Sequence, residues 1–479
     1  MKCLSFLLLL VLLISPARGQ DDESMDAPRK GRGHDGKAKK DLGALPRDEH
    51  GFLKAEVWDM IKATAAANPG GNEAGRLATR PDYQAFYATY AKWKAPEPPA
   101  PPAGKLSNLS ETPKEPRFPL TDKVWPTRVG EASVCLWEDD KLAAMTLGVD
   151  DNNAMDLPYW KGLEKKYGKL NITWNLIVCG IESNVEKGRA SAYGTWKTWQ
   201  QMVSEGYHVS SHSMCHNHDP VPSDGWPGPD WEAAESQRLI NAHIPGFKAK
   251  LFARPGAGVP AFSIVRGSWD ASIKKYYAGA RDGGRDALNE ANMIDYFHIH
   301  STTGNVPAIV DDKDTKVPDQ NLNNLFAADP KHPYHKYYRG WANVFIHFIG
   351  QGKAFDTQAH TVAYGKVLAF YNTHRADLWT GFIDDVALYG QERDTATLKT
   401  DGASDAKIQF TLTSKMDPSV FNYPLTIKVR LPTAWKGAVA QQNNVAVPVA
   451  VITHEGALYA LVKAVPDRGQ VTLTPAAAK

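Results

Sequence analysis

The sequence predicts an α/β fold built on a mainly parallel sheet or barrel, with a helical segment before it and a small β-sandwich after it. Two observations lead to this fold class. Between residues 131 and 398, short apolar segments alternate with amphipathic ones, which is the order expected of parallel strands joined by helices. After residue 398 the pattern changes to short strands in close succession, which is typical of an antiparallel sandwich.

The first 130 residues divide into four segments by composition. Residues 1–19 combine a basic start with an apolar run and a small-residue end, which is the pattern of a secretory signal peptide. Residues 20–48 are charged and poor in large apolar side chains, so we expect them to be disordered. Residues 49–94 carry apolar side chains at helical spacing, and residues 95–130 are a proline-rich linker. An aromatic stripe in the helical segment could bind a sugar, although core packing is the favoured interpretation: Tyr83, Phe86, Tyr90 and Trp93.

The main domain, residues 131–398, is expected to contain eight strands and at least five helices. The expected strands are 133–137, 144–149, 170–178, 208–211, 250–253, 293–300, 341–348 and 380–383. The expected helices are 157–167, 195–205, 231–242, 264–275 and 357–374. Aromatic side chains in or beside its loops could stack on sugar rings if they are exposed: Trp226, Trp231, Tyr334, Tyr337 and Tyr338.

Residues 399–479 are expected to form a separate β-sandwich module. Its expected strands are 407–412, 425–431, 445–453, 458–462 and 469–474. Such a module could bind carbohydrate or merely cover the barrel, and the sequence leaves both possibilities open.

The overall composition excludes a charge-driven partner. The 479 residues carry a formal net charge of +2, so the chain lacks the basic excess of nucleic-acid-binding proteins. The apolar run near the N-terminus is too short for a comfortable membrane span, and no later run would cross a bilayer. We therefore expect an exported, soluble protein, periplasmic or extracellular, without a nucleic-acid partner.

Three cysteines remain once the signal peptide is removed: Cys135, Cys179 and Cys215. An odd number allows at most one intramolecular disulfide. We expect Cys135 to pair with Cys179, because both lie on or beside predicted strands. Cys215 lies between two histidines and could be a soft metal ligand, which is the less favoured interpretation.

Two adjacent carboxylates end the apolar segment at residues 144–149. Asp150 and Asp151 would lie at the carboxyl end of a buried strand, where α/β folds bind their ligands. One carboxylate could complete a metal site while the other takes a proton from water. The alternative is that the pair only caps a helix.

A cluster of histidines follows the expected strand at 208–211. His212 and His216 are four residues apart, and His218 comes two residues later. Closely spaced imidazoles can face one metal ion from a short loop or helical turn. Taken alone, the segment could be a polar surface loop, but the carboxylate pair upstream favours a metal site.

These residues resemble the motifs of polysaccharide deacetylases, which contain a NodB homology domain and are also called carbohydrate esterase family 4. The first family motif, T-F-D-D-G, is similar to residues 146–152, Thr-Leu-Gly-Val-Asp-Asp-Asn, and the second, H-[ST]-x-x-H, is matched by residues 212–216. The third, an R-x-P-type loop, is similar to residues 251–258, and the fifth, a strand ending on His, is matched in type by residues 344–347. The resemblance covers roughly residues 133 to 395 and implies a distorted (β/α) barrel with a deacetylase-like catalytic domain.

The resemblance also implies roles for individual residues. Asp150 would be the general base, and Arg254 would hold and tune it. His347 would be the general acid that protonates the leaving amine or alcohol. The divalent ion would most often be Zn²⁺. Its implied ligands are Asp151, His212 and His216.

The chain departs from the family motifs at several positions. Asn152 replaces the glycine of the first motif, and Ala257 stands where the family commonly has Tyr. The backbone N–H near Ala257 would still contribute to an oxyanion hole. The fourth motif has its nearest candidate at residues 280–284.

The sequence thus predicts a secreted, metal-dependent deacetylase that removes N- or O-acetyl groups from a polysaccharide. Two alternatives remain open. A hydrolase of non-sugar C–N bonds could use the same residues, or the site could have drifted in a secreted carbohydrate-binding protein.

Overall fold

The computed structural model describes residues 81–182, 193–216, 225–255, 262–304, 307–311, 317–347, 349 and 357–477. The expected signal peptide at 1–19, the segment at 20–48 and residues 49–80 of the helical segment lie outside the described residues. The same is true of His218 and of Ala257.

Among the described residues, seven parallel strands close into a barrel. The sheet order is β3-β4-β5-β6-β7-β8-β2-β9, and an additional pairing of β2 with β3 closes the ring. Val149 on β2 therefore pairs with Ile346 on one side and with Trp174 on the other. The strands are β2 (Ala143–Val149), β3 (Ile172–Leu176), β4 (His208–Ser211), β5 (Leu251–Ala253), β6 (Gly279–Asp286), β7 (Ile299–Thr303), β8 (Trp341–Ile346) and β9 (Leu378–Trp379). The expected distorted (β/α) barrel is confirmed.

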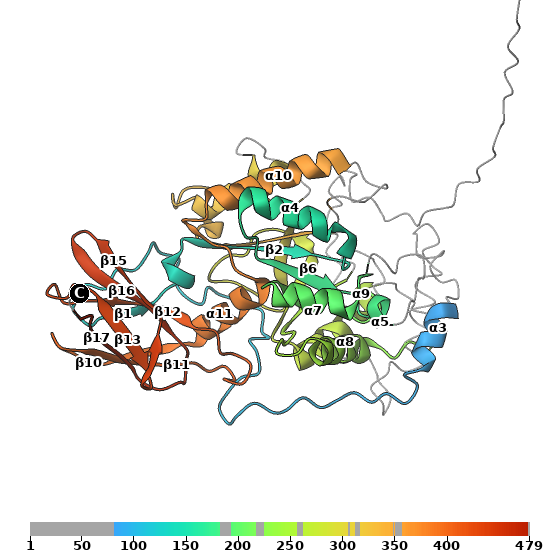
Figure 1. Ribbon diagram of the computed structural model, residues 1–479, viewed down its shortest axis with the longest axis horizontal. Coiled ribbons are helices and arrows are strands. Elements are labelled where there is room, and N and C mark those ends of the chain that lie inside the picture. Colours follow the sequence, from blue (N-terminus) through green and yellow to red (C-terminus); the bar gives the residue numbers. More distant parts are fainter. Residues whose placement is uncertain are drawn as a thin grey trace, which may run out of the picture. The chain divides into compact units, whose positions relative to one another are not determined.

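Helices pack around the outside of this barrel, and Figure 1 shows α4, α7, α8, α9 and α10 around strands β2 and β6. The helices are α3 (Pro81–Ala88), α4 (Leu157–Tyr167), α5 (Cys179–Glu182), α7 (Trp196–Ser204), α8 (Pro229–His243), α9 (Phe262–Tyr276), α10 (Thr357–Thr373) and α11 (Ile383–Thr395). Short 3-10 turns are η1 (Glu138–Asp140), η2 (Ala154–Asp156), η4 (Pro307–Val310), η5 (Pro318–Gln320), η6 (Leu322–Phe326) and η7 (His335–Tyr337). Strands β2 and β8 are buried along almost their whole length, which explains why their sequences are largely apolar rather than alternating.

The C-terminal region forms two antiparallel sheets, as expected for a sandwich. One sheet has the order β1-β12-β16-β15 and the other has the order β10-β11-β17-β13-β14. Their strands are β1 (Ala132–Val134), β10 (Thr397–Ala403), β11 (Ile408–Thr413), β12 (Leu425–Arg430), β13 (Ala438–Gln442), β14 (Val445–Val447), β15 (Val449–His454), β16 (Ala457–Ala464) and β17 (Val471–Pro475).

The expected strand at 133–137 belongs to the sandwich and not to the barrel. It is shorter, as β1, and its Ser133 pairs with Lys428 of β12. The sequence between the linker and β2 therefore contributes an edge strand to the C-terminal module, a long-range pairing that no local pattern signals.

Three further differences from the expected strands have local causes. Strand β6 was not expected, because Gly279–Asp286 is rich in glycine and charge rather than in β-branched side chains. The strand expected at 293–300 is displaced to β7. The single strand expected at 445–453 is divided at Pro448, which has no N–H to donate to a sheet, so β14 joins one sheet and β15 the other.

The barrel and the sandwich share a hydrophobic core. A cluster of buried side chains runs from Trp341 of the barrel through α11 to Ile408 and Ile427 of the sandwich. At the same junction, the Tyr389 hydroxyl donates to the Cys135 carbonyl (2.8 Å). The sandwich therefore packs against the barrel as part of one continuous core.

Cys135, Cys179 and Cys215 are buried, and the expected disulfide between Cys135 and Cys179 is not formed. The physical reason is their placement on different elements. The Cys135 N–H bonds to Thr426 in the sandwich, whereas Cys179 begins α5 and its N–H bonds to the Met214 carbonyl.

The aromatic side chains considered for sugar binding are mostly core residues. Phe86 and Tyr90 of the N-terminal stripe pack edge-on against Trp231, with ring centroids 6.1 and 5.0 Å away. This confirms core packing for Phe86, Tyr90 and Trp93 of that stripe. Four of the five loop aromatics are themselves buried, which removes them as platforms for stacking on a sugar: Trp226, Trp231, Tyr337 and Tyr338.

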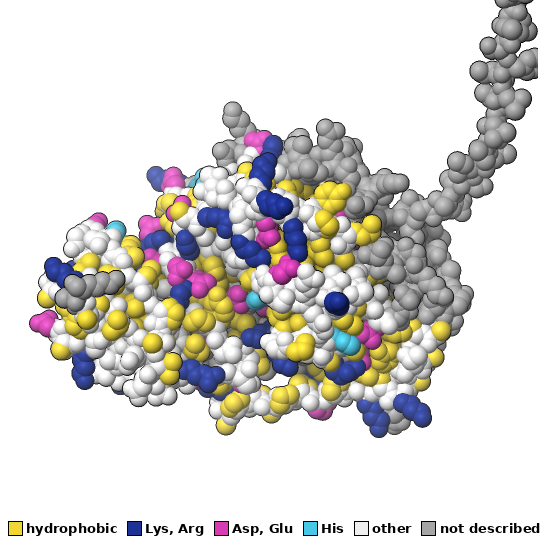
Figure 2. Space-filling model, viewed as in Figure 1, with side chains coloured by type: hydrophobic (Ala, Val, Ile, Leu, Met, Phe, Trp, Pro, Cys, Tyr) yellow, Lys and Arg dark blue, Asp and Glu magenta, His cyan; other side chains and the backbone are white. Residues whose placement is uncertain are grey.

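In the part of the chain that the structure describes, no helix combines the length and the apolar character needed to cross a membrane. On the face shown in Figure 2, basic and acidic side chains are interspersed rather than gathered by sign. This distribution agrees with the small net charge of the sequence.

A buried acid at the junction predicts a pH-dependent stability. Glu392 on α11 is fully buried; its Oε2 accepts from the Tyr423 N–H (3.2 Å), and no described residue donates to its Oε1. Burial is the main cause that raises the pKa of Glu392 from 4.5 to about 8, although the Tyr423 N–H and Lys250 lower it. The folded protein therefore holds this proton more tightly than the unfolded chain does.

We expect Glu392→Gln to stabilise the protein in alkaline solution. The stability that protonated Glu392 contributes is full below its ordinary pKa and is lost as the pH rises through about 8. The variant's free energy of unfolding should exceed that of the wild type by roughly 1–4 kcal/mol at about pH 9, and the difference should shrink toward about pH 5. Urea unfolding at both pH values measures this, and a difference independent of pH would contradict it.

Candidate metal centre

Three strand ends bring the polar clusters of the sequence together. Asp150 and Asp151 follow β2, His212 follows β4 and His347 follows β8. Because these strands are parallel members of one barrel, their carboxyl ends lie at the same end of it. The Asp150 N–H donates to the Ile346 carbonyl of β8 (2.7 Å), which fixes the start of this segment against the neighbouring strand.

The segment after β2 is a turn of left-handed residues. The φ angles of Asp151, Asn152 and Asn153 are 61°, 61° and 42°. Asparagine adopts this conformation more readily than most other residues, so Asn152 meets the backbone requirement that a glycine would meet here. Its side chain also accepts from the Ile177 N–H (2.7 Å), and the Asn153 amide donates to the Asp150 carbonyl (2.7 Å). The departure from the family motif therefore adds contacts that hold the turn.

Asp151, His212 and His216 converge on one point. The Asp151 Oδ1 lies 3.5 Å from the His212 Nε2 and 3.4 Å from the His216 Nε2. All three donor atoms lie within 4.8 Å of one another, so the group could hold a metal ion. The Asp151 Oδ1 is buried and receives no hydrogen bond from a described residue, although buried carboxylate oxygens are normally satisfied.

Both imidazoles are oriented by their surroundings. The His212 Nδ1 lies 2.8 Å from the Ala253 carbonyl oxygen, so Nδ1 carries the proton and the Nε2 lone pair faces the centre. The His216 N–H donates to the Ser213 hydroxyl (2.8 Å), and both residues have left-handed backbones. These contacts hold the two rings toward Asp151 before any ion binds.

This donor set fits a divalent ion such as Zn²⁺. Two imidazole nitrogens and one carboxylate oxygen form the three-ligand set of catalytic zinc sites, which leaves a position for water or substrate. The charges agree. Burial by itself lowers the pKa of His212, but Asp150 and Asp151 raise it above its ordinary value. The centre therefore favours positive charge.

Asp150 lies beside this group and is held by two side chains. It is 2% exposed, and the Arg281 Nη2 donates to its Oδ1 (2.6 Å) and Oδ2 (2.5 Å). The Asn175 amide donates to Oδ1 (2.7 Å). Burial raises the pKa of Asp150, but Arg281 in the first place, then His212 and His347, lower it below its ordinary value. Asp150 is therefore a buried, ionised carboxylate.

The expected contact between Arg254 and Asp150 is replaced by a contact with Arg281. The Arg254 Nη1 lies 2.6 Å from the Asp270 Oδ1, and its Nη2 donates to the Phe297 carbonyl (2.9 Å). Arg254 follows the end of β5, whereas Arg281 lies within β6 and reaches Asp150 on β2. The sequence indicates residues 280–284 only as a candidate for the fourth motif. The one signal for Arg281 is that it is the single cationic residue of this segment.

His347 lies on the open side of Asp150. Its Nε2 is 4.0 Å from the Asp150 Oδ2, and its side chain is 38% exposed. The Asp150 Oδ2 is also 3.9 Å from the His212 Nε2. The Asp150 Oδ2 therefore lies between His212 of the donor group and His347, where a proton acceptor would need to be.

A second group of donors lies at the opposite end of β4. The His208 Nδ1 lies 2.8 Å from the Asp384 Oδ1, and Asp385 is the third member of the group. The His208 ring also stacks on the Phe382 ring, with centroids 3.7 Å apart. This pairing joins the start of β4 to the first turn of α11, and it does not approach Asp150.

Comparison with known proteins finds one extended sequence relative that spans most of this chain. No protein-family model matches the chain. Over 369 residues, which are 74% of this chain, the sequence is 31% identical to a gellan lyase of Bacillus sp. The chain covers only 14% of that protein's length.

Several solved structures of deacetylases also match. A peptidoglycan deacetylase of Bacillus subtilis matches with 16% identity and a TM-score of 0.27, over 51% of this chain and 89% of its own. A mutant of a CE4-family pseudoenzyme with restored activity matches with 14% identity and a TM-score of 0.27, over 51% and 68%. A deacetylase of Streptococcus pyogenes matches with 16% identity and a TM-score of 0.25, over 32% and 62%.

We expect Asp151→Asn to remove metal binding. The exchange replaces the only carboxylate of the donor group with a weakly ligating amide, so zinc retained after dialysis should fall from about one ion per chain to a small fraction of that. Elemental analysis of the purified protein measures this. The matched control is His347→Gln, which changes a neighbouring imidazole outside the donor group and should leave zinc content unchanged. Equal zinc in Asp151→Asn and wild type would contradict the assignment.

Proposed function

We propose that this protein is a metal-dependent deacetylase that removes N- or O-acetyl groups from a polysaccharide. One observation carries the proposal. The donor group Asp151, His212 and His216 lies beside a separate buried carboxylate, Asp150, and a half-exposed imidazole, His347, at the carboxyl end of a (β/α) barrel. Three functions are therefore held within one space: metal binding, proton acceptance and proton donation.

The metal would be held by Asp151 and by the Nε2 atoms of His212 and His216. When bound, a divalent ion supplies Lewis acidity, which polarises the acetyl carbonyl and makes a nearby water easier to deprotonate. The zinc assignment is part of the proposal and follows from the two nitrogens and one oxygen of the donor set.

Asp150 takes the proton from the attacking water. Arg281 and Asn175 keep the carboxylate ionised and fix its plane, so that Oδ2 faces the reacting atoms. The water oxygen then forms a bond to the acetyl carbon. His347, in its protonated form, donates to the leaving nitrogen or oxygen as the bond to the acetyl carbon breaks. Acetate and a free amine or hydroxyl are the products.

We propose that the protein acts outside the cytoplasm, because residues 1–19 have the composition of a signal peptide. We also propose that the segment shared with the gellan lyase carries deacetylation and not lyase chemistry. The site contains a metal donor group and a matched base, and the shared segment is a small part of that relative.

The first experiment measures acetate release from acetylated substrates of several classes. Chitin oligomers, acetylxylan, acetylated gellan and a non-sugar N-acetyl amide should be incubated with the zinc-loaded protein. Acetate from at least one glycan is expected. Unsaturated sugar ends without acetate would indicate lyase chemistry, and hydrolysis of only the non-sugar amide would indicate an amidohydrolase.

We expect Asp150→Asn to lower kcat by about 10²–10⁴-fold, because the general base is lost. Zinc content should remain at the wild-type level, since Asp150 is outside the donor group. Acetate release and elemental analysis on the same preparation measure both quantities. A variant that keeps both its zinc and its activity would contradict the role of Asp150.

We expect Arg281→Met to lower kcat/KM by about 10–100-fold with zinc retained, because the carboxylate loses the partner that fixes it. Arg254→Met is the comparison, since it removes a buried guanidinium that contacts Asp270 instead. A larger loss of activity in Arg254→Met than in Arg281→Met, at equal folded fraction by circular dichroism, would return the positioning role to Arg254.

A further inference from the structure

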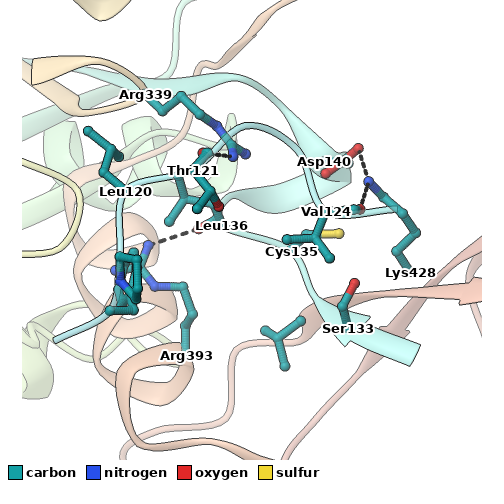
Figure 3. A pocket seen from close by; sticks show the side chains of 13 residues that line it. Leu120, Thr121, Val124, Ser133, Cys135, Leu136, Asp140, Arg339, Arg393 and Lys428 are labelled. Atoms are coloured by element: carbon teal, nitrogen blue, oxygen red, sulfur yellow. Dashed lines mark hydrogen bonds and ion pairs between the residues drawn. The ribbon is translucent and has the colours of Figure 1, made fainter. Parts of the chain in front are cut away.

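A cavity of about 220 Å³ lies at the junction of the barrel and the sandwich, away from the metal centre. Its apolar wall comes from the irregular segment before β1, which includes Leu120 and Val124, and from the residues just after β1, which include Leu136 (Figure 3). Its charged wall comes from Arg339 before β8, Arg393 on α11, Lys428 on β12 and Asp140 in η1. The cavity therefore combines an apolar side with an unusual number of buried cations.

Two of the three cations have carboxylate partners. The Lys428 Nζ lies 2.7 Å from the Asp140 Oδ2, and the Arg393 Nη2 lies 2.7 Å from the Asp394 Oδ1. In Figure 3 the Lys428 side chain joins Asp140, whereas Arg339 points to Thr121 on another side of the cavity. Each of these carboxylates also lies near a second cation: Lys123 is 3.8 Å from Asp140, and Arg117 is 3.4 Å from Asp394. Neither carboxylate is therefore left over to pair with Arg339.

Arg339 is a buried cation without an ion pair. It is 4% exposed, and no carboxylate of a described residue lies within 4.0 Å of its guanidinium. Its Nε donates to the Leu142 carbonyl (3.3 Å) and its Nη1 to the Thr121 carbonyl (2.9 Å). No described residue accepts from its Nη2, which leaves donors of the planar fork available at the cavity wall.

The backbone holds this side chain in place. Arg339 has a left-handed φ of 57°; its N–H donates to the Leu325 carbonyl and its carbonyl accepts from the Trp137 indole (2.7 Å). Such a conformation is costly for a residue with a side chain and is kept where the surroundings impose it. Burial also lowers the pKa of Arg339, although Asp140 raises it. The charge is thus fixed where an anion would relieve the cost of burying it.

We propose that this cavity binds a small ligand that carries one carboxylate, with Arg339 as its anchor. Arg339 makes no ion pair with a described residue, so a single carboxylate could pair with it, and the planar fork of arginine matches the geometry of a carboxylate. The apolar wall would contact the body of the ligand, and the volume limits that body to about the size of one sugar ring or less. A free carboxylic acid and the uronic acid of a glycan share this chemistry. The proposal does not depend on the deacetylase activity.

Calorimetric titration of the zinc-loaded full-length protein tests the proposal with four probes: sodium D-glucuronate, sodium acetate, D-glucose and inorganic phosphate. We expect glucuronate to bind with a Kd of about 0.1–1 mM and neutral glucose not to bind. Acetate binding as tight as that of glucuronate would support a site for the carboxylate alone, and much weaker acetate binding would support a sugar acid. Binding of phosphate only, or of no probe, would overturn the proposal.

Arg339→Met should weaken glucuronate binding at least 10-fold, whereas Arg128→Met, which removes an 86% exposed arginine near the same segment, should not. Equal binding by Arg339→Met and the wild type would overturn the assignment. If Arg339→Met does not fold, Val124→Trp provides the second variant. Its larger side chain, at an exposed position of the wall, should obstruct the cavity and reduce binding while Arg339 is kept. Unchanged binding in Val124→Trp would equally count against the cavity.

Discussion

The buried ion pair between Asp150 and Arg281 is the interaction on which the site depends. Two opposite charges that are almost completely removed from water are stable only together, and removal of one would leave the other uncompensated. The pair joins the residue after β2 to β6, and Asn175 on β3 adds a contact from a third strand. Side chains from three neighbouring parts of the barrel therefore meet at Asp150. Asp151 inherits its position from this pair because it is the next residue along the chain.

The same rule governs the other end of the barrel, where the sandwich packs. Lys428 and Asp140 neutralise each other there, and Arg393 pairs with Asp394. Glu392 avoids an unpaired buried charge in another way, because burial raises its pKa to about 8 and the carboxyl group stays protonated at neutral pH. Arg339 makes no ion pair with a described residue, and it also does not become neutral, because an arginine does not readily lose its proton. That contrast is why the cavity beside Arg339, rather than another polar group at the junction, points to a ligand.

At two positions the site differs from the family motif in residue type or in the origin of a side chain, yet the backbone conformation and the contact to the base are retained. Asn152 stands where the family motif has glycine; it has a left-handed backbone, which glycine adopts readily, and its side chain accepts a hydrogen bond from the Ile177 N–H. The arginine that holds the base comes from β6 and not from the loop after β5. Ala253 and Arg281 are partners in the pairing of β5 with β6, so the two arginines start from neighbouring positions on adjacent strands. Strand register, and not sequence order, selects which guanidinium reaches Asp150.

The sequence by itself determined the elements whose signals are local. Apolar runs predicted β2, β4 and β8, helical periodicity predicted α4 and α10, and the His and Asp motifs indicated which side chains would meet. Only the tertiary structure decided the features that depend on distant partners: the pairing of β1 with the sandwich, the strand β6 in a glycine-rich segment, the contact of Arg281 with Asp150, and the separation of Cys135 from Cys179. The physical reason is that a local pattern reports burial and backbone preference, whereas the partner of a buried charge or an edge strand is fixed by closure of the barrel and by strand register.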